Sequence, residues 1–183
     1  MNVTADLDAR FRAAAVAEGL VDVRYDVIES PVGNLHVAAT SRGLCRISYR
    51  EDGWEEQLAR TFGVRVLRSA LDDARRELDE YFEGRRREFD LPLDLRVAPF
   101  YADVLRELAL VPYGRTDTYG ALAKRVGRPK AARAVGTVMN RNPIPIVLPC
   151  HRIVGASGAL TGYAGGLEVK RRLLELEGAI FKG

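Results

Sequence analysis

The sequence predicts an α/β (α+β) protein in two parts, on three observations. Short alternating apolar segments separated by tight turns fill much of the first half, and longer segments with helical apolar spacing fill the second. The 183 residues, 47% hydrophobic and 29% charged, suffice for a buried core. We expect an N-terminal α/β domain over residues 1–95, three-layer-like, with a small antiparallel sheet plus helices. A mostly helical C-terminal domain with a helix-turn-helix is expected over residues 96–183.

The N-terminal part begins with an amphipathic helix and continues as three short strands. Gly-containing turns between these strands predict an antiparallel meander. Pro92 interrupts a later alternating segment, which favours an edge strand or an extended linker over a central strand. The expected strands are residues 23–27, 35–39 and 44–49, the expected helices are 4–19, 53–62 and 70–82, and the expected extended segments are 64–67 and 89–95.

Four helices are expected in the C-terminal part, at residues 100–111, 119–126, 130–139 and 167–178. Thr118 is a suitable N-cap for the second, since a threonine hydroxyl accepts from helix N–H groups. Gly127-Arg128-Pro129 makes a tight turn before the third. A helix, a short turn and a second, basic helix have helix-turn-helix spacing. An irregular loop is expected at 140–145 and a hairpin-like turn at 155–158.

Basic residues are concentrated in the C-terminal part. Residues 113–152 hold eight of them against one acid, Asp117. Such an excess is typical of a surface that binds nucleic-acid phosphates, although the net charge of the whole chain is only +3. The eight are Arg115, Lys124, Arg125, Arg128, Lys130, Arg133, Arg141 and Arg152. A separate run, Arg85-Arg86-Arg87, is interpreted as a solvated loop, with direct DNA contact as the alternative.

Cysteine usage and hydropathy indicate the compartment. Two cysteines without CxxC spacing predict neither a disulfide framework nor a metal site. No apolar run approaches the roughly 18 to 20 residues that span a bilayer, and the N-terminus lacks the order of a signal peptide. A cytoplasmic protein without a membrane partner is therefore expected.

A nucleophile motif, Pro149-Cys150-His151-Arg152, follows the apolar run at 146–148. A thiol is nucleophilic only as thiolate, which requires a base or a positive charge because the ordinary thiol pKa is about 8.5. Both kinds of group adjoin Cys150 in the sequence. Since side chains alternate in extended backbone, His151 need not contact the sulfur directly. The alternative for Cys150 is a buried structural cysteine.

This motif, followed by Ile-Val, resembles the acceptor-cysteine motif of the methylated-DNA–protein-cysteine methyltransferases, also called O6-alkylguanine-DNA alkyltransferases. Three further segments resemble this family in the same order. Residues 129–136 resemble its recognition helix, 142–145 its asparagine hinge and 162–167 its substrate loop. The resemblance extends over about residues 30–178 and is densest from residue 99 onward.

The chain departs from the family pattern at a few positions. Tyr101 and Leu105 stand where glutamine and tryptophan are frequent, and Ala164 replaces a serine found in some relatives. His36 and Cys45 are too few for the zinc site of some members. None of these departures touches the nucleophile.

The resemblance implies that Cys150 accepts an alkyl group from O6 of a damaged guanine. A water would bridge the thiol to His151, and Glu177 would bind the other imidazole nitrogen. Tyr119 would donate to a guanine ring nitrogen, and Asn142 would tie its loop together through main-chain hydrogen bonds. Glu177 also ends a helix, where the helix dipole disfavours a carboxylate, so a partner is expected. The alternatives are a core histidine, a surface glutamate and a simple turn asparagine.

The resemblance also implies that the target nucleotide is flipped out of the duplex into a pocket. The N–H of Ala164 would face O6, and the main-chain carbonyls of Cys150 and Ile153 would accept from the exocyclic amine. Arg133 would enter the vacated space, with a phosphate contact as its alternative. The expected pocket residues are Met139, Pro145, Ile153, Tyr163 and Ala164, with a plain core role as the alternative for Met139. The expected DNA-binding residues, in the minor groove, are Lys130, Ala131, Ala132, Arg133, Gly136 and Tyr119.

The expected function is therefore repair of duplex DNA by stoichiometric, single-turnover alkyl transfer from O6-alkylguanine, and also from O4-alkylthymine, to Cys150. A thioether resists thiol exchange, and no Gly-rich loop for a nucleotide methyl donor is visible, so no cofactor is expected. The expected partner is double-stranded DNA, bound by a monomer, with cooperative assembly on DNA left open. The alternatives are a non-catalytic alkylated-DNA sensor or helix-turn-helix regulator, and a cysteine hydrolase.

Overall fold

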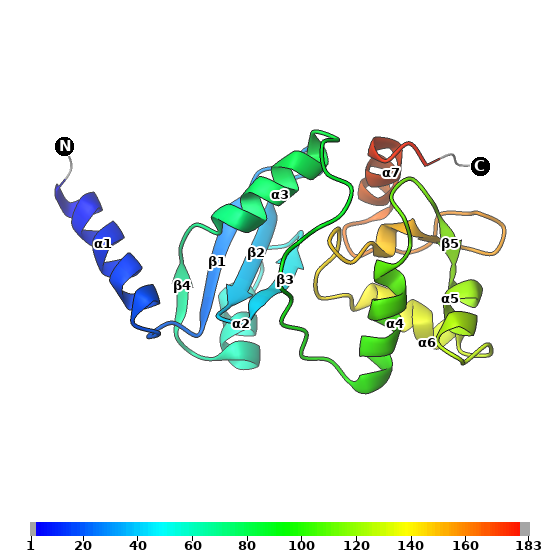
Figure 1. Cartoon of the computed structure of the whole chain (residues 1–183), viewed down its shortest axis with the longest axis horizontal. Coiled ribbons are helices and arrows are strands. Elements are labelled where there is room, and N and C mark those ends of the chain that lie inside the picture. Colours follow the sequence, from blue (N-terminus) through cyan, green and yellow to red (C-terminus); the bar gives the residue numbers. More distant parts are fainter. Residues whose placement is uncertain (1–2, 180–183) are drawn as a thin grey trace.

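The computed structural model describes residues 3–179, and Figure 1 shows an elongated molecule whose N-terminal and C-terminal parts lie next to each other. Helix α1 (Val3–Ala17) projects from one end (Figure 1). The expected helix is therefore present, but its apolar side chains Leu7 and Phe11 are 64% and 73% exposed. The amphipathic pattern of this helix does not bury these side chains in the core.

The N-terminal sheet has four strands in the order β3-β2-β1-β4. The strands are β1 (Val23–Ile28), β2 (Leu35–Thr40), β3 (Gly43–Ser48) and β4 (Val66–Arg68). The expected antiparallel meander of the first three is confirmed. The sheet as a whole is mixed, however, because β4 pairs parallel to β1. Parallel pairing needs a crossover, and helix α2 (Trp54–Phe62) provides it between β3 and β4.

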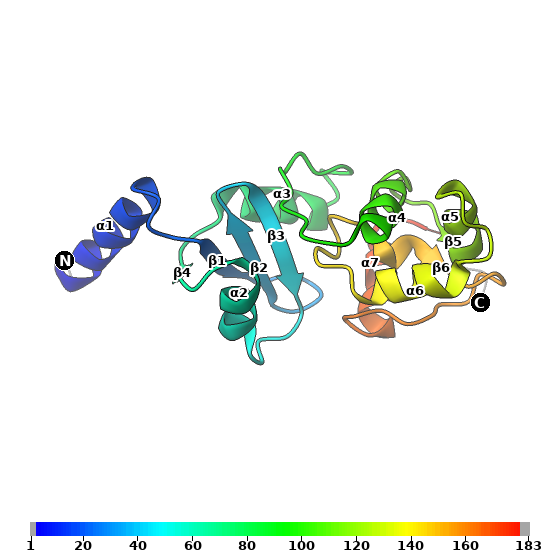
Figure 2. The ribbon, with the colours of Figure 1, turned by 90° about the horizontal axis from the view of Figure 1, so that it is seen from below.

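Helices cover both faces of this sheet, as Figure 2 shows. Helix α3 (Asp72–Phe82) buries Leu78 and Tyr81 against one face, and α2 buries Trp54 and Leu58 against the other. The two faces carry separate apolar clusters. The three-layer arrangement is thus produced by two amphipathic helices that enclose a sheet with apolar residues on both sides.

Strand β3 lies at the edge of the sheet and is covered at two points. Leu44 donates its N–H to the Pro92 carbonyl at 2.8 Å, within the extended segment expected at 89–95. That segment makes only an isolated bridge there, so it is a linker rather than a strand. Further along β3, Ile47 donates to the Pro143 carbonyl at 2.8 Å. This second bond ties the sheet edge to a loop of the C-terminal part.

The C-terminal part is mostly helical, as expected. Its elements are α4 (Pro99–Ala109), β5 (Asp117–Thr118), α5 (Tyr119–Arg125), α6 (Ala132–Asn140), a 3-10 helix η1 (Cys150–Arg152), β6 (Ile153–Val154) and α7 (Leu167–Leu176). The Thr118 hydroxyl accepts from Ala121 N–H at 3.1 Å, which confirms the predicted cap of α5. Gly127, at φ 71°, turns the chain from α5 toward α6. The helix-turn-helix is therefore formed by α5 and α6.

A two-residue parallel pair, β5 with β6, was not apparent from the sequence. It joins Thr118, the cap of α5, to Val154, two residues after η1. The main apolar cluster contains residues from both parts of the chain, including Tyr81 and Leu173. None of the helices within residues 3–179 has the length and apolar character needed to cross a bilayer.

Candidate active site

Cys150 is the first residue of the 3-10 helix η1, not part of an extended strand as expected. This turn is closed by bonds between residues three apart, from Arg152 N–H to the Pro149 carbonyl at 2.9 Å and from Ile153 N–H to the Cys150 carbonyl. The alternation expected for an extended chain therefore does not apply here. Cys150 is only 3% exposed and His151 is fully buried.

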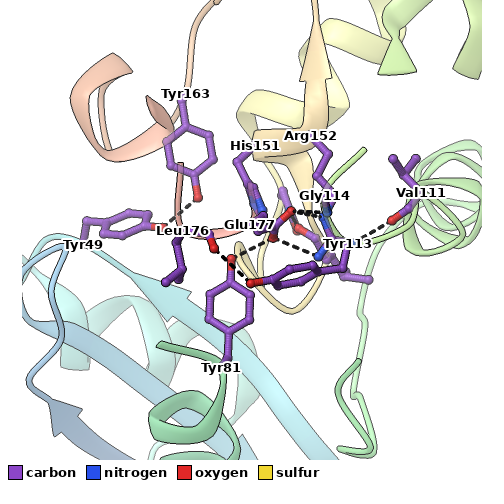
Figure 3. Close-up of polar contacts among 12 residues, drawn as sticks. Tyr49, Tyr81, Val111, Tyr113, Gly114, His151, Arg152, Tyr163, Leu176 and Glu177 are labelled. Carbon is purple, nitrogen blue, oxygen red and sulfur yellow. Dashed lines mark hydrogen bonds and ion pairs between the residues drawn. The ribbon is translucent and has the colours of Figure 1, made fainter. Parts of the chain in front are cut away.

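The carboxylate of Glu177, at the C-terminal end of α7, is the centre of the polar contacts near η1 (Figure 3). Its Oε1 accepts from His151 Nε2 at 2.7 Å, from the Tyr81 hydroxyl at 2.8 Å and from Arg152 Nη2 at 2.9 Å. Its Oε2 accepts from Arg152 Nε at 2.9 Å and from Gly114 N–H at 3.2 Å. Because the side chain is wholly buried, the alternative of a surface glutamate is wrong.

These donors keep Glu177 ionised in a dry site. Burial alone would raise its pKa, but the hydrogen bonds from His151 and Arg152 and the charge of the guanidinium outweigh burial and lower the pKa to about 2. The carboxylate lies at the C-terminal end of α7, where the helix dipole disfavours a negative charge. Arg152 compensates for that placement with two hydrogen bonds of 2.9 Å.

Arg152 is not placed as the sequence predicted, either as a positive charge beside the thiol or as part of a basic surface. Its Nη1 donates to the Val111 carbonyl at 2.6 Å, and the residue is 5% exposed. The guanidinium is therefore committed to Glu177 and Val111. It is therefore not part of an exposed phosphate-binding surface.

His151 presents one nitrogen to the carboxylate and leaves the other free. Since a carboxylate only accepts, the imidazole carries its proton on Nε2. Its Nδ1 has no hydrogen-bond partner among the described residues. Burial lowers the pKa of His151. The imidazole is therefore neutral near pH 7 and has an acceptor nitrogen available as a base.

The thiol of Cys150 is protonated in this state. Burial raises its pKa to about 11, against the opposing effects of the Asn142 amide and the Lys170 ammonium. The net pKa of the thiol stays raised although His151 and Arg152 are adjacent in the sequence, because the turn of η1 leaves the sulfur buried. A thiol with this pKa needs a base to become a thiolate near pH 7.

Asn142 holds the loop that leads to the cysteine. Its Nδ2 donates to the Leu148 carbonyl at 2.7 Å and its Oδ1 accepts from Ile144 N–H at 3.1 Å. Both bonds go to the main chain, as expected. Ile146 lies between the two bonded residues, Ile144 and Leu148. Its φ of 77° is a left-handed conformation that β-branched residues rarely adopt. The loop is therefore held in a strained form by the amide of Asn142.

Lys170 was not among the expected site residues. It is fully buried in α7, and its Nζ donates to the Ile153 carbonyl at 2.5 Å and to the Thr161 carbonyl at 3.0 Å. Burial lowers its pKa to about 8. A signal was present in the sequence: Lys170 shares the helical spacing i, i+3, i+4 with Leu173 and Leu174, which face the core.

Two of the five expected pocket residues, Pro145 and Ala164, line one cavity of about 590 Å³. Tyr49 from the N-terminal part lines it too, and its hydroxyl lies 2.7 Å from that of Tyr163 (Figure 3). Met139 and Ile153 are buried and do not line this cavity. For Met139 this position agrees with the alternative of a core role.

The expected DNA-binding residues lie on α6, on the two residues before it and at the start of α5. Lys130 and Arg133 are exposed, while Ala131, Ala132 and Gly136 are partly buried. Tyr119 lies beside Gly136 and shares a 2.8 Å hydrogen bond with the Thr161 hydroxyl.

Not every basic residue of residues 113–152 is available to a phosphate. Arg125 pairs with Glu107 at 3.2 Å and with Asp117, and Arg152 is buried. The separate basic run at 85–87 is also engaged, because Arg86 pairs with Glu80 at 2.8 Å. Direct DNA contact by this run therefore has no support from its contacts.

Comparisons with known proteins match both parts of the chain. The family model "6-O-methylguanine DNA methyltransferase, ribonuclease-like domain" matches residues 23–95, and "6-O-methylguanine DNA methyltransferase, DNA binding domain" matches residues 99–179. A methylated-DNA–protein-cysteine methyltransferase of Methanosarcina acetivorans is 40% identical over 163 residues, covering 85% of this chain and 98% of the relative. One of Mycobacterium bovis is 44% identical over 156 residues, covering 85% and 92%.

A solved structure is similar over the same length. The crystal structure of Mycobacterium tuberculosis OGT in complex with DNA has a TM-score of 0.76 and 42% identity, covering 85% of this chain and 92% of that one. Both parts of the fold are thus matched. The chain therefore belongs to the 6-O-methylguanine DNA methyltransferase family of DNA-repair enzymes.

Proposed function

We propose that this chain repairs duplex DNA by moving the alkyl group from O6 of a guanine to Sγ of Cys150, once per molecule. The observation that carries the proposal is the buried series Cys150, His151 and Glu177. The carboxylate of Glu177 orients a neutral imidazole, and that histidine directly follows the cysteine in the sequence. The relatives named for this reaction and the DNA complex of a similar protein support it.

The chemistry follows from the protonation states. The thiol proton passes to Nδ1 of His151, relayed by a water molecule, as sulfur attacks the alkyl carbon. The carbon–sulfur bond forms while the bond from carbon to O6 breaks, and its electron pair stays with the guanine. The leaving base takes a proton at a ring nitrogen from the Tyr119 hydroxyl, and the phenolate is reprotonated by solvent, which afterwards receives the proton taken up by His151. Glu177 stabilises the imidazolium that results.

The placement of the two cysteines supports a single turnover. A thioether is not released by thiol exchange. Cys45, the other cysteine, is buried in β3 on the face covered by α2, and its Sγ donates to the Ala38 carbonyl at 3.3 Å. Burial raises its pKa to about 12. Cys45 is thus neither near the acceptor nor reactive enough to regenerate it.

The proposal extends to how the lesion is reached. The target nucleotide leaves the stack, which costs a few kcal/mol, and Arg133 on α6 occupies its place. Small residues along α6 suit a narrow minor groove, and the chain acts on DNA as a monomer. O4-alkylthymine, which offers a similar alkyl–oxygen bond, is the second substrate.

Intact-protein mass spectrometry tests the proposed function. The chain is mixed with a duplex that contains one O6-methylguanine, and an unmodified duplex of the same sequence is the control. We expect a gain of one methylene, located on Cys150 by peptide mapping and never exceeding one per chain. Unchanged mass with retained DNA binding would instead favour a damage sensor, and continued turnover would contradict the stoichiometric reaction.

Arg133→Ala is expected to slow repair of duplex DNA by about 10- to 100-fold. The arginine would stabilise the flipped state, and each 1.4 kcal/mol of that stabilisation lost lowers the rate about tenfold. Reaction with free O6-benzylguanine should change less than about twofold, because a free base needs no flipping. Single-turnover rates with both substrates measure the difference. Arg171→Ala, which removes an exposed arginine of α7, is the matched control. Equal slowing on both substrates would rule out the intercalating role.

A further inference from the structure

Tyr81 belongs to the N-terminal part, yet its hydroxyl reaches the proposed acceptor site. The residue lies on the buried face of α3 and is 0% exposed. Its hydroxyl donates to Oε1 of Glu177, 96 residues away in the sequence, at 2.8 Å (Figure 3). Among the described residues, Tyr81 is the one N-terminal side chain that hydrogen-bonds this carboxylate.

Tyr81 and His151 share one oxygen atom. Oε1 of Glu177 accepts from the phenol at 2.8 Å and from His151 Nε2 at 2.7 Å. A carboxylate oxygen has a limited number of lone-pair directions, so each donor restricts where the others can bind. The hydrogen bond from the phenol therefore fixes the orientation in which Oε1 accepts from the imidazole. It also withdraws electron density that would otherwise stabilise a proton on His151.

The ring and the hydroxyl of Tyr81 have separable roles. The ring packs in an aromatic cluster, with centroids 5.2 Å from Phe82, 5.5 Å from Phe89 and 6.1 Å from Tyr113. The hydroxyl is buried, and the carboxylate can only accept from it. Tyr81→Phe therefore keeps the packing and removes only the contact with Glu177.

We propose that Tyr81 is a positioning residue whose hydroxyl holds the Glu177 carboxylate on His151, which makes helix α3 a component of the alkyl-acceptor site. The inference rests on the proposed function, because the site that Tyr81 serves is the one where Cys150 accepts the alkyl group. It assigns the N-terminal part a role in the chemistry through the side chain of Tyr81.

Other charged and titratable groups face the same carboxylate. From η1 these are His151 and Arg152, and from the connection between α4 and β5 it is Tyr113, whose hydroxyl donates to the Leu176 carbonyl at 3.1 Å. Lys170 of α7 acts on the imidazole at longer range. All of these remain unchanged in Tyr81→Phe, so a shift in the titration of His151 reports the lost hydroxyl.

The test compares wild type with Tyr81→Phe by two measurements. The chain contains two histidines, so isotope-labelled imidazoles can be titrated individually by NMR, with His36 as the internal reference. We expect the pKa of His151 to rise by up to about 1 unit in the variant, because Oε1 gains electron density. In the pH profile of transfer from free O6-benzylguanine, the acidic limb should move to higher pH by the same amount as the pKa of His151. At a given pH on that limb, the transfer rate should therefore fall up to about tenfold.

Tyr25→Phe is the matched control, because it removes another tyrosine hydroxyl bound to a glutamate, Glu55, within the N-terminal part. It should change neither the His151 titration nor the acidic limb. Rates are normalised to the fraction of chains alkylated at completion, so partial unfolding does not imitate the effect. If His151 or the limb does not move in Tyr81→Phe, the proposal is overturned. If wild type accepts no alkyl group at all, the proposed function fails instead, and the NMR titration still decides whether Tyr81 acts on His151.

Discussion

Cys150→Ser is expected to abolish alkyl transfer while binding to duplex DNA is retained. A serine hydroxyl ionises far less readily than a thiol, and deletion of a covalent nucleophile costs on the order of 10⁶-fold in rate in other enzymes. In the proposed function, binding depends instead on exposed basic residues at the start of α6 and just before it, Arg133 and Lys130, which the substitution does not touch. Intact mass after incubation with an O6-methylguanine duplex measures transfer, and fluorescence anisotropy at fixed salt measures binding.

Cys45→Ser is the matched control for this variant. Cys45 is equally buried, but it lies in β3 on the face of the sheet covered by α2. We expect it to lose some stability and to keep full, single-turnover transfer to Cys150. Transfer that survives in Cys150→Ser, or that disappears in Cys45→Ser, would contradict the assignment of the acceptor. A parallel loss of DNA binding in Cys150→Ser would contradict the separation of chemistry from recognition.

Features encoded within a short stretch of sequence were predictable. The cap of α5 by Thr118 and the left-handed turn at Gly127 follow from residue type, and both place the helix-turn-helix correctly. The main-chain bonds of Asn142 span only a few residues. The observed bounds of an element differ from the predicted ones where a turn replaces the end of a helix. For example, Ala131 N–H bonds to the Arg128 carbonyl at 2.8 Å, so α6 begins at Ala132.

Features that depend on distant partners were not predictable from local pattern. The three residues of β4 show no preference for a partner, and their parallel pairing with β1 depends on the crossover through α2. The helical spacing of α3 predicts that Tyr81 is buried but not that its hydroxyl meets Glu177. Arg152 adjoins the nucleophile in sequence, yet η1 directs its guanidinium to Glu177 and away from the thiol.

Glu177→Gln is expected to cost about 3–5 kcal/mol in the free energy of unfolding, the usual cost of leaving one member of a buried ion pair without its partner. The amide removes the charge that compensates Arg152, which is only 5% exposed. It also places N–H groups where five donors converge. Urea unfolding at pH 7 measures the loss. Glu168→Gln is the control, because it removes an exposed carboxylate of the same helix and should cost under about 1 kcal/mol.

The same variant should slow alkyl transfer by up to about 10⁴-fold, as expected when an imidazole is held in the wrong tautomer. A carboxylate accepts from Nε2 of His151, which leaves Nδ1 as the base. The amide of a glutamine can instead donate to Nε2, and the imidazole proton then moves to Nδ1. Single-turnover rates with free O6-benzylguanine separate this effect from DNA binding. A variant that is destabilised but fully active would show that Glu177 supports the fold and not the reaction.

The pH dependence of stability provides an independent check on Glu177. Its pKa in the folded chain, about 2, lies below the ordinary value of 4.5. The stability that it contributes is therefore fully present above pH 4.5 and is lost as the pH falls toward 2, by about 3 kcal/mol in total. The difference in unfolding free energy between wild type and Glu177→Gln should shrink by that amount across this window. A difference that stays constant below pH 4.5 would mean that the carboxylate is not held ionised by Arg152 and His151.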